Sequence, residues 1–297
     1  MTAVAEKITE PGVYDDVPDE VYHADPVEGG SLSSTGARRL LPPSCPAKFR
    51  WEQDHPRDNV PEFNLGHAAH KLVLGIGPEL VVVEAENWRT KKAQNTRDEA
   101  LAEGAVPLLP FEMEQVEAMA AALRAHPIAS ALLRPGTGRT ELTLVWRDVP
   151  TGVMRRARLD KLTKDRRGRV LIVDYKTAAS SEPAKFEKAI HERGYHQQLD
   201  FYKDGVLELG LGSEVVPLLV AQEKTPPYVV TVVQPTESAM FWGGVLNRTA
   251  VDLFAQCQRT GVWPGYSDEI VLAALPGWAE RQYEDARERG DYDIKEK

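Results

Sequence analysis

The stretch from residue 140 to residue 177 constrains the fold more than any other part of the chain. It contains three runs with the pattern of β-strands, TELTLVWRD, VMRRARLDKLTK and VLIVDYKT, separated by the short turns VPTG and DRRGR. Three strands joined by tight turns predict an antiparallel meander. The third run begins with almost only apolar residues, which is typical of a central strand buried on both faces.

Helical patterns on either side of these strands complete the fold class. Apolar residues at helical spacing predict helices over about 61–75, 111–126, 182–209 and 237–260, and a short basic helix follows the serines near residue 33. Two further strands, VVPLLVAQEK and YVVTVVQP, precede the last of these helices. This order predicts an α/β fold of the α+β mixed-sheet kind, with a central mixed sheet flanked by helices.

The chain is expected to hold one folded domain between two acidic ends. We assign residues 1–30 to an acidic irregular arm, residues 31–267 to a single domain and residues 268–297 to an acidic C-terminal extension. Within the domain, a helical insertion is expected at about 80–135 and the catalytic core at about 140–235.

Charge is distributed unevenly along the 297 residues. The formal net charge is −9, which on its own argues against a protein that coats nucleic acid through bulk basicity. Residues 1–35 hold eight acidic residues against one basic residue, and residues 268–297 hold nine against five. The middle of the chain is slightly basic, and residues 154–169 hold eight basic residues against two acidic ones. We therefore expect contact with a polyanion through a local basic surface, although a solvated charged hairpin is the alternative.

Cysteine content and apolar runs limit the cellular setting. The two cysteines, Cys45 and Cys257, cannot supply a four-cysteine zinc or iron–sulfur site, and we expect both to be reduced. We see neither a secretory signal pattern nor an apolar run that approaches a membrane span. A soluble protein of the cytoplasm with no membrane partner is expected.

Two aspartates and a lysine at the strand ends form the candidate chemical site. Asp174 and Lys176 are two residues apart in a strand and should project to the same face. If the second and third strands pair through DRRGR, Asp160 becomes a cross-strand neighbour of Asp174. Two adjacent carboxylates repel each other unless a cation lies between them, and oxygen ligands of this kind suit Mg²⁺ or Mn²⁺. From spacing alone, surface carboxylates with a solvated lysine remain an alternative.

These residues resemble a known signature. Asp160 followed by Asp174, Tyr175 and Lys176 is similar to the motif of the PD-(D/E)XK nuclease superfamily, here in the form D…DYK. The segment GHAAH, which ends at His70, resembles the GxxxH motif of the branch that holds RecE, lambda exonuclease and the RecB nuclease domain. The segment QLDFY resembles the QxxxY motif of the same branch. The four motifs occur in that branch's order, and the resemblance covers roughly residues 15–275 and implies a restriction-endonuclease-like core.

The resemblance implies metal-ligating roles for four residues. His70 and Asp160 would ligate a metal ion, Asp174 would ligate as well and could bridge two ions, and the backbone carbonyl of Tyr175 would be a further ligand. Lys176 would position or activate the attacking water. The alternative for His70 alone is a satisfied core histidine.

Three more catalytic-site residues follow from the resemblance. Glu141 would help to organise the site, and Gln198 and Tyr202 would hold their helix against the site or contact a phosphate. Each has a plainer alternative: an ordinary acidic residue at a strand start for Glu141, a buried hydrogen-bonding residue for Gln198 and a core aromatic for Tyr202.

The resemblance implies an activity and partners. The expected activity is that of a Mg²⁺-dependent (or Mn²⁺-dependent) deoxyribonuclease with two ions and no iron–sulfur cluster. It would be a 5′→3′ exonuclease that degrades linear double-stranded DNA from its ends and leaves 3′ single strands for recombination in a bacterial or phage-infected cell. A RecT-like annealing protein and a homo-oligomeric ring are implied partners. The residues expected to contact DNA are Arg38, Arg39, Arg89, Lys91, Lys92, Arg155, Arg156, Arg158 and Lys161.

Two rival functions stay open at this point. One is a PD-(D/E)XK nuclease that is specific for single strands or cleaves endonucleolytically. The other is a DNA-binding module that has lost catalysis, against which the intact His70, Asp160, Asp174 and Lys176 argue.

Overall fold

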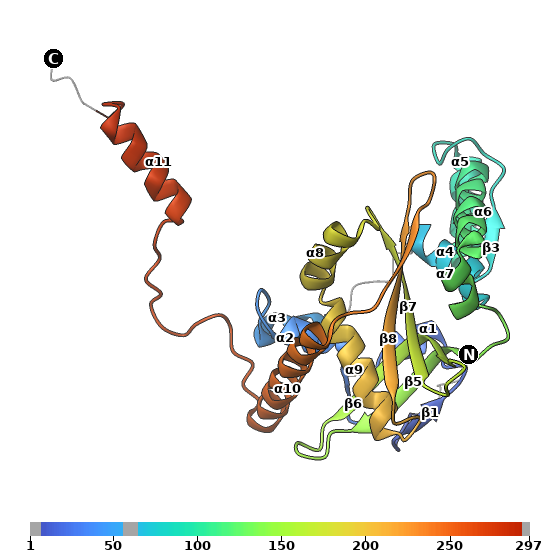
Figure 1. Ribbon diagram of the computed structural model, residues 1–297, viewed down its shortest axis with the longest axis horizontal. Coiled ribbons are helices and arrows are strands. Elements are labelled where there is room, and N and C mark those ends of the chain that lie inside the picture. Colours follow the sequence, from blue (N-terminus) through green and yellow to red (C-terminus); the bar gives the residue numbers. More distant parts are fainter. Residues whose placement is uncertain (1–6, 56–64, 293–297) are drawn as a thin grey trace. The chain divides into compact units, whose positions relative to one another are not determined.

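The computed structural model describes residues 7–55 and 65–292, which divide into two compact units, Met1–Trp263 and Pro264–Lys297 (Figure 1). Within the described residues, the larger unit is built on a seven-stranded mixed sheet with the strand order β1-β5-β6-β7-β8-β9 and β2 beside β6. These strands are β1 (Gly12–Tyr14), β2 (Leu32–Ser33), β5 (Arg139–Arg147), β6 (Met154–Lys164), β7 (Val170–Ala178), β8 (Val215–Glu223) and β9 (Val230–Val233). The predicted mixed sheet is confirmed.

The predicted meander forms the middle of this sheet. β5 pairs with β6 and β6 with β7, both in antiparallel fashion, and β8 lies parallel to β7 on its other side. Every residue from 170 to 175 is buried, as the apolar run VLIVDY predicted for a central strand. A parallel neighbour requires a crossover connection, which two helices between β7 and β8 supply.

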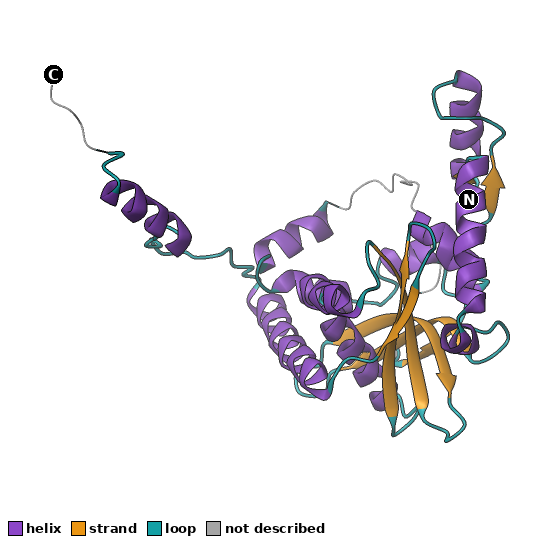
Figure 2. Ribbon diagram, turned by 45° about the horizontal axis from the view of Figure 1, so that its top comes forward, coloured by secondary structure: helices purple, strands orange, loops and turns teal. Residues whose placement is uncertain are grey.

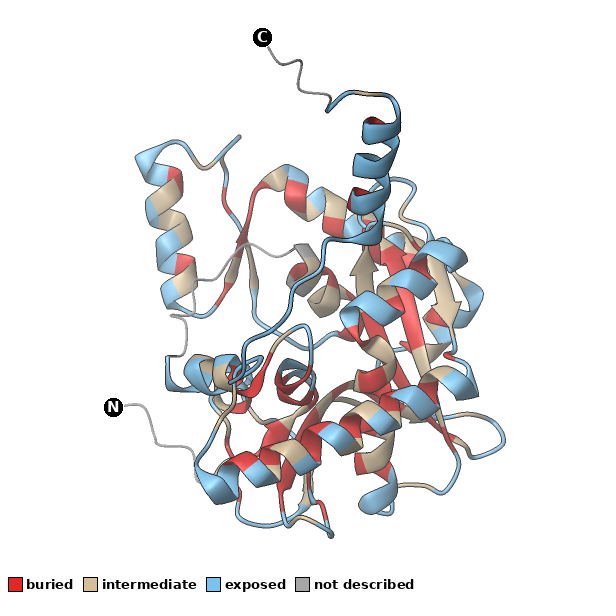
Figure 3. Cartoon of the chain, turned by 90° about the vertical axis from the view of Figure 1, so that its left-hand side faces the viewer, coloured by how far each residue is buried: buried red, intermediate tan, exposed pale blue. Residues whose placement is uncertain are grey.

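Helices cover both faces of the sheet (Figure 2). One apolar cluster joins one face to α2, α3, α8, α9 and α10, and a second joins the other face to α4, α6 and α7. The helices of the larger unit are α1 (Asp19–His23), α2 (Ser34–Leu40), α3 (Pro46–Asp54), α4 (Leu65–Leu74), α5 (Lys91–Ala102), α6 (Pro110–Ala125), α7 (Pro127–Leu132), α8 (Pro183–Arg193), α9 (Tyr195–Glu208) and α10 (Glu237–Thr260). Figure 3 shows buried residues concentrated on the strands and on the sides of the helices that face them.

Two element predictions require correction. The expected long helix over 182–209 is two helices, because Gly194 adopts a φ of +66°, a left-handed conformation that ends α8 and begins α9. The insertion at 80–135 is not purely helical, since β3 (Leu80–Val82) and β4 (Val106–Leu108) form a two-stranded parallel sheet.

The acidic N-terminal segment is also more ordered than expected. Instead of an irregular arm, β1 pairs with the edge of β5, and Ile8 and Val27 are buried in a small apolar cluster with Val145 and Met154. These elements could not be predicted from the short, polar sequence, because a strand of three residues is too short to show the alternation of apolar and polar residues.

The C-terminal unit contains α11 (Gly277–Glu288), preceded by residues without regular structure. Among the described residues, none of the helices combines the length and the apolar composition needed to cross a membrane.

Candidate metal centre

Three carboxylates lie side by side on the three strands of the meander. Lys161 in β6 pairs with the residue before Glu141 in β5 and with the residue before Asp174 in β7. Its neighbour Asp160 is therefore in line with both acids. The ladder is interrupted at Glu141, whose φ of +51° is uncommon for a residue other than glycine. Backbone strain of this kind is concentrated at functional sites.

His70 joins this group from α4. Its Nδ1 lies 3.3 Å from Oε1 of Glu141 and its Nε2 lies 3.0 Å from Oδ2 of Asp160. One ligand atom from each of the three side chains lies within 4.8 Å of the others. Ala68 and Ala69 are fully buried in the cluster that α4 forms with α6 and β7, so small residues let this part of the helix pack closely. The GxxxH segment therefore places its histidine over the carboxylates.

Asp174 and Lys176 form the second half of the site. Nζ of Lys176 lies 2.7 Å from Oδ2 of Asp174, as the i, i+2 spacing predicted. The Asp174 side chain is 1% exposed, and apart from this ion pair neither of its oxygens has a hydrogen-bond partner in the described part of the chain. A buried carboxylate in this state is costly, and a bound cation would remove that cost.

Tyr175 connects the two halves through its backbone and its ring. Its N–H donates to Oδ2 of Asp160 at 2.8 Å, and its hydroxyl donates to Oε1 of the fully buried Gln222 at 2.6 Å. Gln222 in turn donates to the carbonyl of Met119 in α6 at 2.7 Å. Through Tyr175, the strand that carries Asp174 is thus hydrogen-bonded to a side chain of β6 on one side and to a side chain of β8 on the other. The role of the Tyr175 carbonyl as a ligand stays a prediction.

The QxxxY segment lies on α9 beside the same carboxylates. Nε2 of Gln198 donates to the hydroxyl of Tyr202 at 2.7 Å, an i, i+4 pair on one helix face. Burial raises the pKa of Tyr202 well above its ordinary value, and the nearby charges of Asp174 and Asp160 raise it further. Tyr202 is therefore a neutral hydrogen-bonding group next to the acids.

Burial and the charges of neighbouring groups shift the pKa values of the residues in the centre. Burial lowers the pKa of His70, but the carboxylates of Asp160 and Glu141 outweigh this and raise it to about 9. Burial together with the charge of Asp160 raises the pKa of Glu141 to about 7. Burial also raises the pKa of Asp174 to about 6, against the opposing charge of Lys176. For Asp160, His70 and Lys176 outweigh burial and lower the pKa.

This donor set fits a divalent cation. Carboxylate oxygens with one imidazole nitrogen suit Mg²⁺ or Mn²⁺. The observation that favours an ion here is the buried Asp174 carboxylate, whose oxygens have no polar partner other than Lys176 in the described part of the chain. The residues that would hold it are His70, Glu141, Asp160 and Asp174. The ion would take over the charge balance that the His70 proton now provides.

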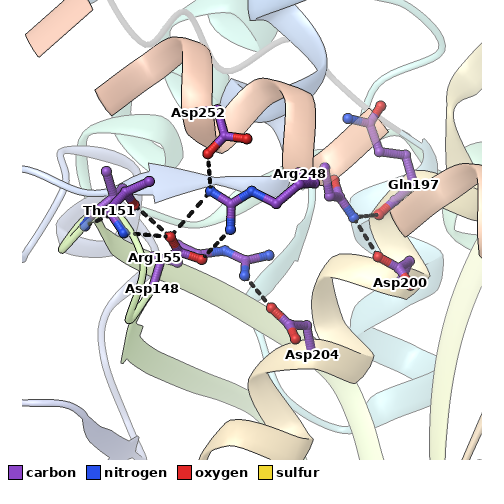
Figure 4. A network of polar contacts seen from close by, with 10 residues as sticks. Asp148, Thr151, Arg155, Gln197, Asp200, Asp204, Arg248 and Asp252 are labelled. Carbon is purple, nitrogen blue, oxygen red and sulfur yellow. Dashed lines mark hydrogen bonds and ion pairs between the residues drawn. The ribbon is translucent and has the colours of Figure 1, made fainter. Parts of the chain in front are cut away.

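Four of the nine residues expected to contact DNA are instead structural. Arg155 is buried and forms an ion pair with Asp204 (Figure 4). Its guanidinium group also lies over the rings of Trp146 and Phe201. Lys161 is 1% exposed and donates to the carbonyl of Arg134 at 3.0 Å. Neither side chain can reach a phosphate.

The other two corrections involve the acidic N-terminal segment. Arg156 is buried and lies 2.9 Å from a carboxylate oxygen of Asp25. Arg158 lies 2.9 Å from Oδ1 of Asp19 and is 11% exposed. Arg156 and Arg158 are thus paired with acids that lie more than a hundred residues away in the sequence, which a local charge count cannot detect.

The remaining five basic residues reach solvent. Arg38 donates to the backbone carbonyl of Arg193, and Arg39 forms an ion pair with Glu52 at 2.8 Å, both from exposed positions on α2. The other three lie at the start of α5 and are exposed: Arg89, Lys91 and Lys92.

Two residues of the centre were not singled out from the sequence. Gln222 could not be predicted from the sequence, because a single glutamine in an apolar strand matches no known motif. Tyr195 could have been predicted from its spacing, because it lies three residues before Gln198, one helical turn away on the same face. Its ring centroid is 5.2 Å from Nζ of Lys176.

Comparisons with known proteins agree with this fold. The family model described as "PDDEXK-like domain of unknown function (DUF3799)" matches residues 48–275. The crystal structure of a protein from Eubacterium rectale described as "Putative exonuclease" superposes with a TM-score of 0.58 at 12% identity, covering 90% of this chain and 98% of that chain. At that identity the likeness shows the fold alone. A second solved structure, SSO0001, reaches a TM-score of only 0.34 at 14% identity, covering 75% and 74% of the two chains. No curated protein matches the chain.

Proposed function

The chain belongs to the PDDEXK-like family DUF3799, and on that premise we propose that it is a metal-dependent nuclease that hydrolyses phosphodiester bonds of DNA. The observation that carries the proposal is the buried carboxylate of Asp174 beside Lys176, next to the cluster of Asp160, Glu141 and His70. The exonuclease description of the Eubacterium rectale protein supports the same class of activity.

Some side chains of the centre would bind the cations, and Lys176 would act on the attacking water or the phosphate. His70, Glu141, Asp160 and Asp174 would hold two Mg²⁺ or Mn²⁺ ions. Bound divalent ions stabilise the attacking and leaving oxygens of an in-line displacement. Asp174 and Asp160 outweigh burial and raise the pKa of Lys176, so the side chain is a cation at neutral pH. Lys176 therefore acts as a hydrogen-bond donor that orients the attacking water or stabilises charge on the phosphate.

The finer proposal concerns direction and substrate. We propose a 5′→3′ exonuclease that degrades linear duplex DNA and leaves 3′ single strands for a RecT-like annealing protein. The order of the GxxxH, D, DxK and QxxxY motifs supports this branch. The proposal includes a homo-oligomeric ring around the DNA, with Arg38, Arg39, Arg89, Lys91 and Lys92 as phosphate contacts.

Digestion of linear and covalently closed circular duplex DNA of the same sequence tests the proposal. With Mg²⁺, the wild type should release nucleotides progressively from linear DNA, faster from 5′-phosphate than from 5′-hydroxyl ends, and leave closed circles intact. Asp174→Ala should abolish degradation, whereas Asp98→Ala, an exposed carboxylate on α5, should not change it. Cleavage of closed circles would contradict the exonuclease. DNA binding without any degradation by the wild type would point to a module that has lost catalysis.

A further inference from the structure

The aromatic ring of Tyr195 lies against Lys176. The distance from Nζ of Lys176 to the ring centroid is 5.2 Å, within the range of cation–π attraction. Tyr195 is the first residue of α9, and Gln198 and Tyr202 follow at i+3 and i+7. The three side chains therefore share one helix face, the face that meets the carboxylate centre.

Local structure fixes the position of this ring. Gly194 immediately before it has a φ of +66°, and a Cβ at that position would lie 2.6 Å from Cδ of Arg38. The α8–α9 junction is thus closely packed, and it sets the direction in which α9 begins. On α8, the ring of the buried Phe186 lies with its centroid 6.1 Å from that of Tyr195. Tyr195 is held by the fold independently of Lys176.

Lys176 needs a contact that does not depend on Asp174. Its four-carbon stem is flexible, its side chain is 20% exposed, and the only ion pair it forms within the described residues is with Asp174. Once Asp174 shares its negative charge with a divalent cation, its attraction for the ammonium group weakens. The contact with the Tyr195 ring is unaffected by that sharing.

We infer that Tyr195 is a positioning residue for Lys176, holding its ammonium group over the ring while the carboxylates bind metal; this rests on the proposed function. The ring, not the hydroxyl, carries the role. The face of a phenylalanine ring attracts a cation as well, so phenylalanine should substitute and an aliphatic residue should not.

Steady-state cleavage of linear duplex DNA by matched variants tests this role. Tyr195→Leu should lower kcat by about tenfold with little change in KM, because the loss falls on the chemical step and not on DNA binding. Tyr195→Phe should retain kcat within about twofold. Phe241→Leu, the same loss of an aromatic ring at an exposed position on α10, serves as the control and should leave kcat near the wild-type value. Equal losses in the Phe and Leu variants, or unchanged kcat in Tyr195→Leu, would overturn the inference.

The reactivity of Lys176 provides a readout that needs no nuclease activity. In trace acetylation with acetic anhydride, followed by peptide mass spectrometry, the rate at Lys176 is compared with the exposed Lys185 and Lys188 on α8. Tyr195→Leu should increase the relative rate at Lys176 several-fold in the presence of Mg²⁺, and Tyr195→Phe should not. An unchanged rate in the leucine variant would refute the positioning role even if the wild type degrades DNA. An increased rate would support it even if the wild type proves inactive.

Discussion

Asp174 has an environment that favours function over stability. Its carboxylate is buried with Lys176 as its ion-pair partner, and burial raises its pKa to about 6. A raised folded-state pKa means that the fold prefers the protonated acid. Folding free energy is therefore lost as the pH rises from about 4 to about 6, and that cost falls away when a cation binds.

Replacing the charge should consequently stabilise the protein without metal. At pH 7.5 in EDTA, Asp174→Asn should increase the free energy of unfolding by about 1–3 kcal/mol, because a neutral amide avoids the cost of the buried charge. Thermal and urea unfolding measure the change. With Mg²⁺ the wild type should gain stability and the variant should not. A variant that is less stable than the wild type in EDTA would contradict this description of the site.

Metal affinity should depend on pH through His70 and Glu141. Their pKa values are raised to about 9 and about 7, so at neutral pH a binding ion must displace protons. The apparent affinity for Mn²⁺ should increase from pH 6 to pH 9, with release of protons. Isothermal titration calorimetry in buffers of different ionisation enthalpy measures both. An affinity that is constant over this range would show that these groups are not ligands.

At the scale of elements, the packing of α9 against α10 holds the QxxxY face in place. A Cβ on Gly243 of α10 would lie 2.5 Å from the backbone oxygen of His196 in α9, whereas a Cβ on the adjacent Gly244 would approach no atom closer than 3.4 Å. Gly243 therefore permits the close approach of the two helices, directly beside Tyr195 and Gln198.

The two neighbouring glycines make a matched pair. Gly243→Ala should destabilise the fold by about 1–3 kcal/mol through the clash, despite the better helix propensity of alanine. Gly244→Ala should be neutral or stabilise by up to about 1 kcal/mol. Urea unfolding of both variants gives the comparison, and equal effects of the two substitutions would argue against a special close contact at Gly243.

The helices and strands also show which parts of the fold could be predicted from the sequence. The meander, the buried β7 and the bounds of α10 follow from local periodicity and were predictable. The break at Gly194 was not, because a glycine inside a helical pattern is tolerated often enough to be ambiguous. The pairing of Arg155 with Asp204 and of Arg158 with Asp19 depends on tertiary contacts, so eight basic residues close together in sequence overstated the basic surface.

At the scale of the whole molecule, charge is compensated across long sequence distances. The acidic N-terminal segment supplies Asp19 and Asp25 to the arginines of β6, and Asp15 pairs with Arg139 at 2.6 Å. The acidity of this segment is therefore partly internal. Of the basic residues expected to contact DNA, those on α2 and at the start of α5 are the ones that remain exposed.

The salt dependence of DNA binding tests this assignment. In a catalytically inactive Asp174→Asn background, the triple substitution of Arg89, Lys91 and Lys92 by alanine should weaken duplex binding and reduce the slope of log affinity against log salt by about 1–3. Arg166→Ala with Arg167→Ala is the control, because these exposed arginines lie in the turn before β7 and are not among the residues expected to contact DNA. Fluorescence anisotropy measures both. Slopes reduced equally in the two variants would refute a specific role for α5.

The central claim is that the carboxylate centre hydrolyses DNA with a divalent ion, and nucleotide release from linear duplex DNA across magnesium concentrations tests it most directly. The wild type should show no release in EDTA and a saturable increase with Mg²⁺. Asp160→Asn should remove most of that release while remaining folded, because Asp160 contacts both His70 and the backbone of Tyr175. Release that is independent of Mg²⁺, or that persists unchanged in Asp160→Asn, would contradict the account.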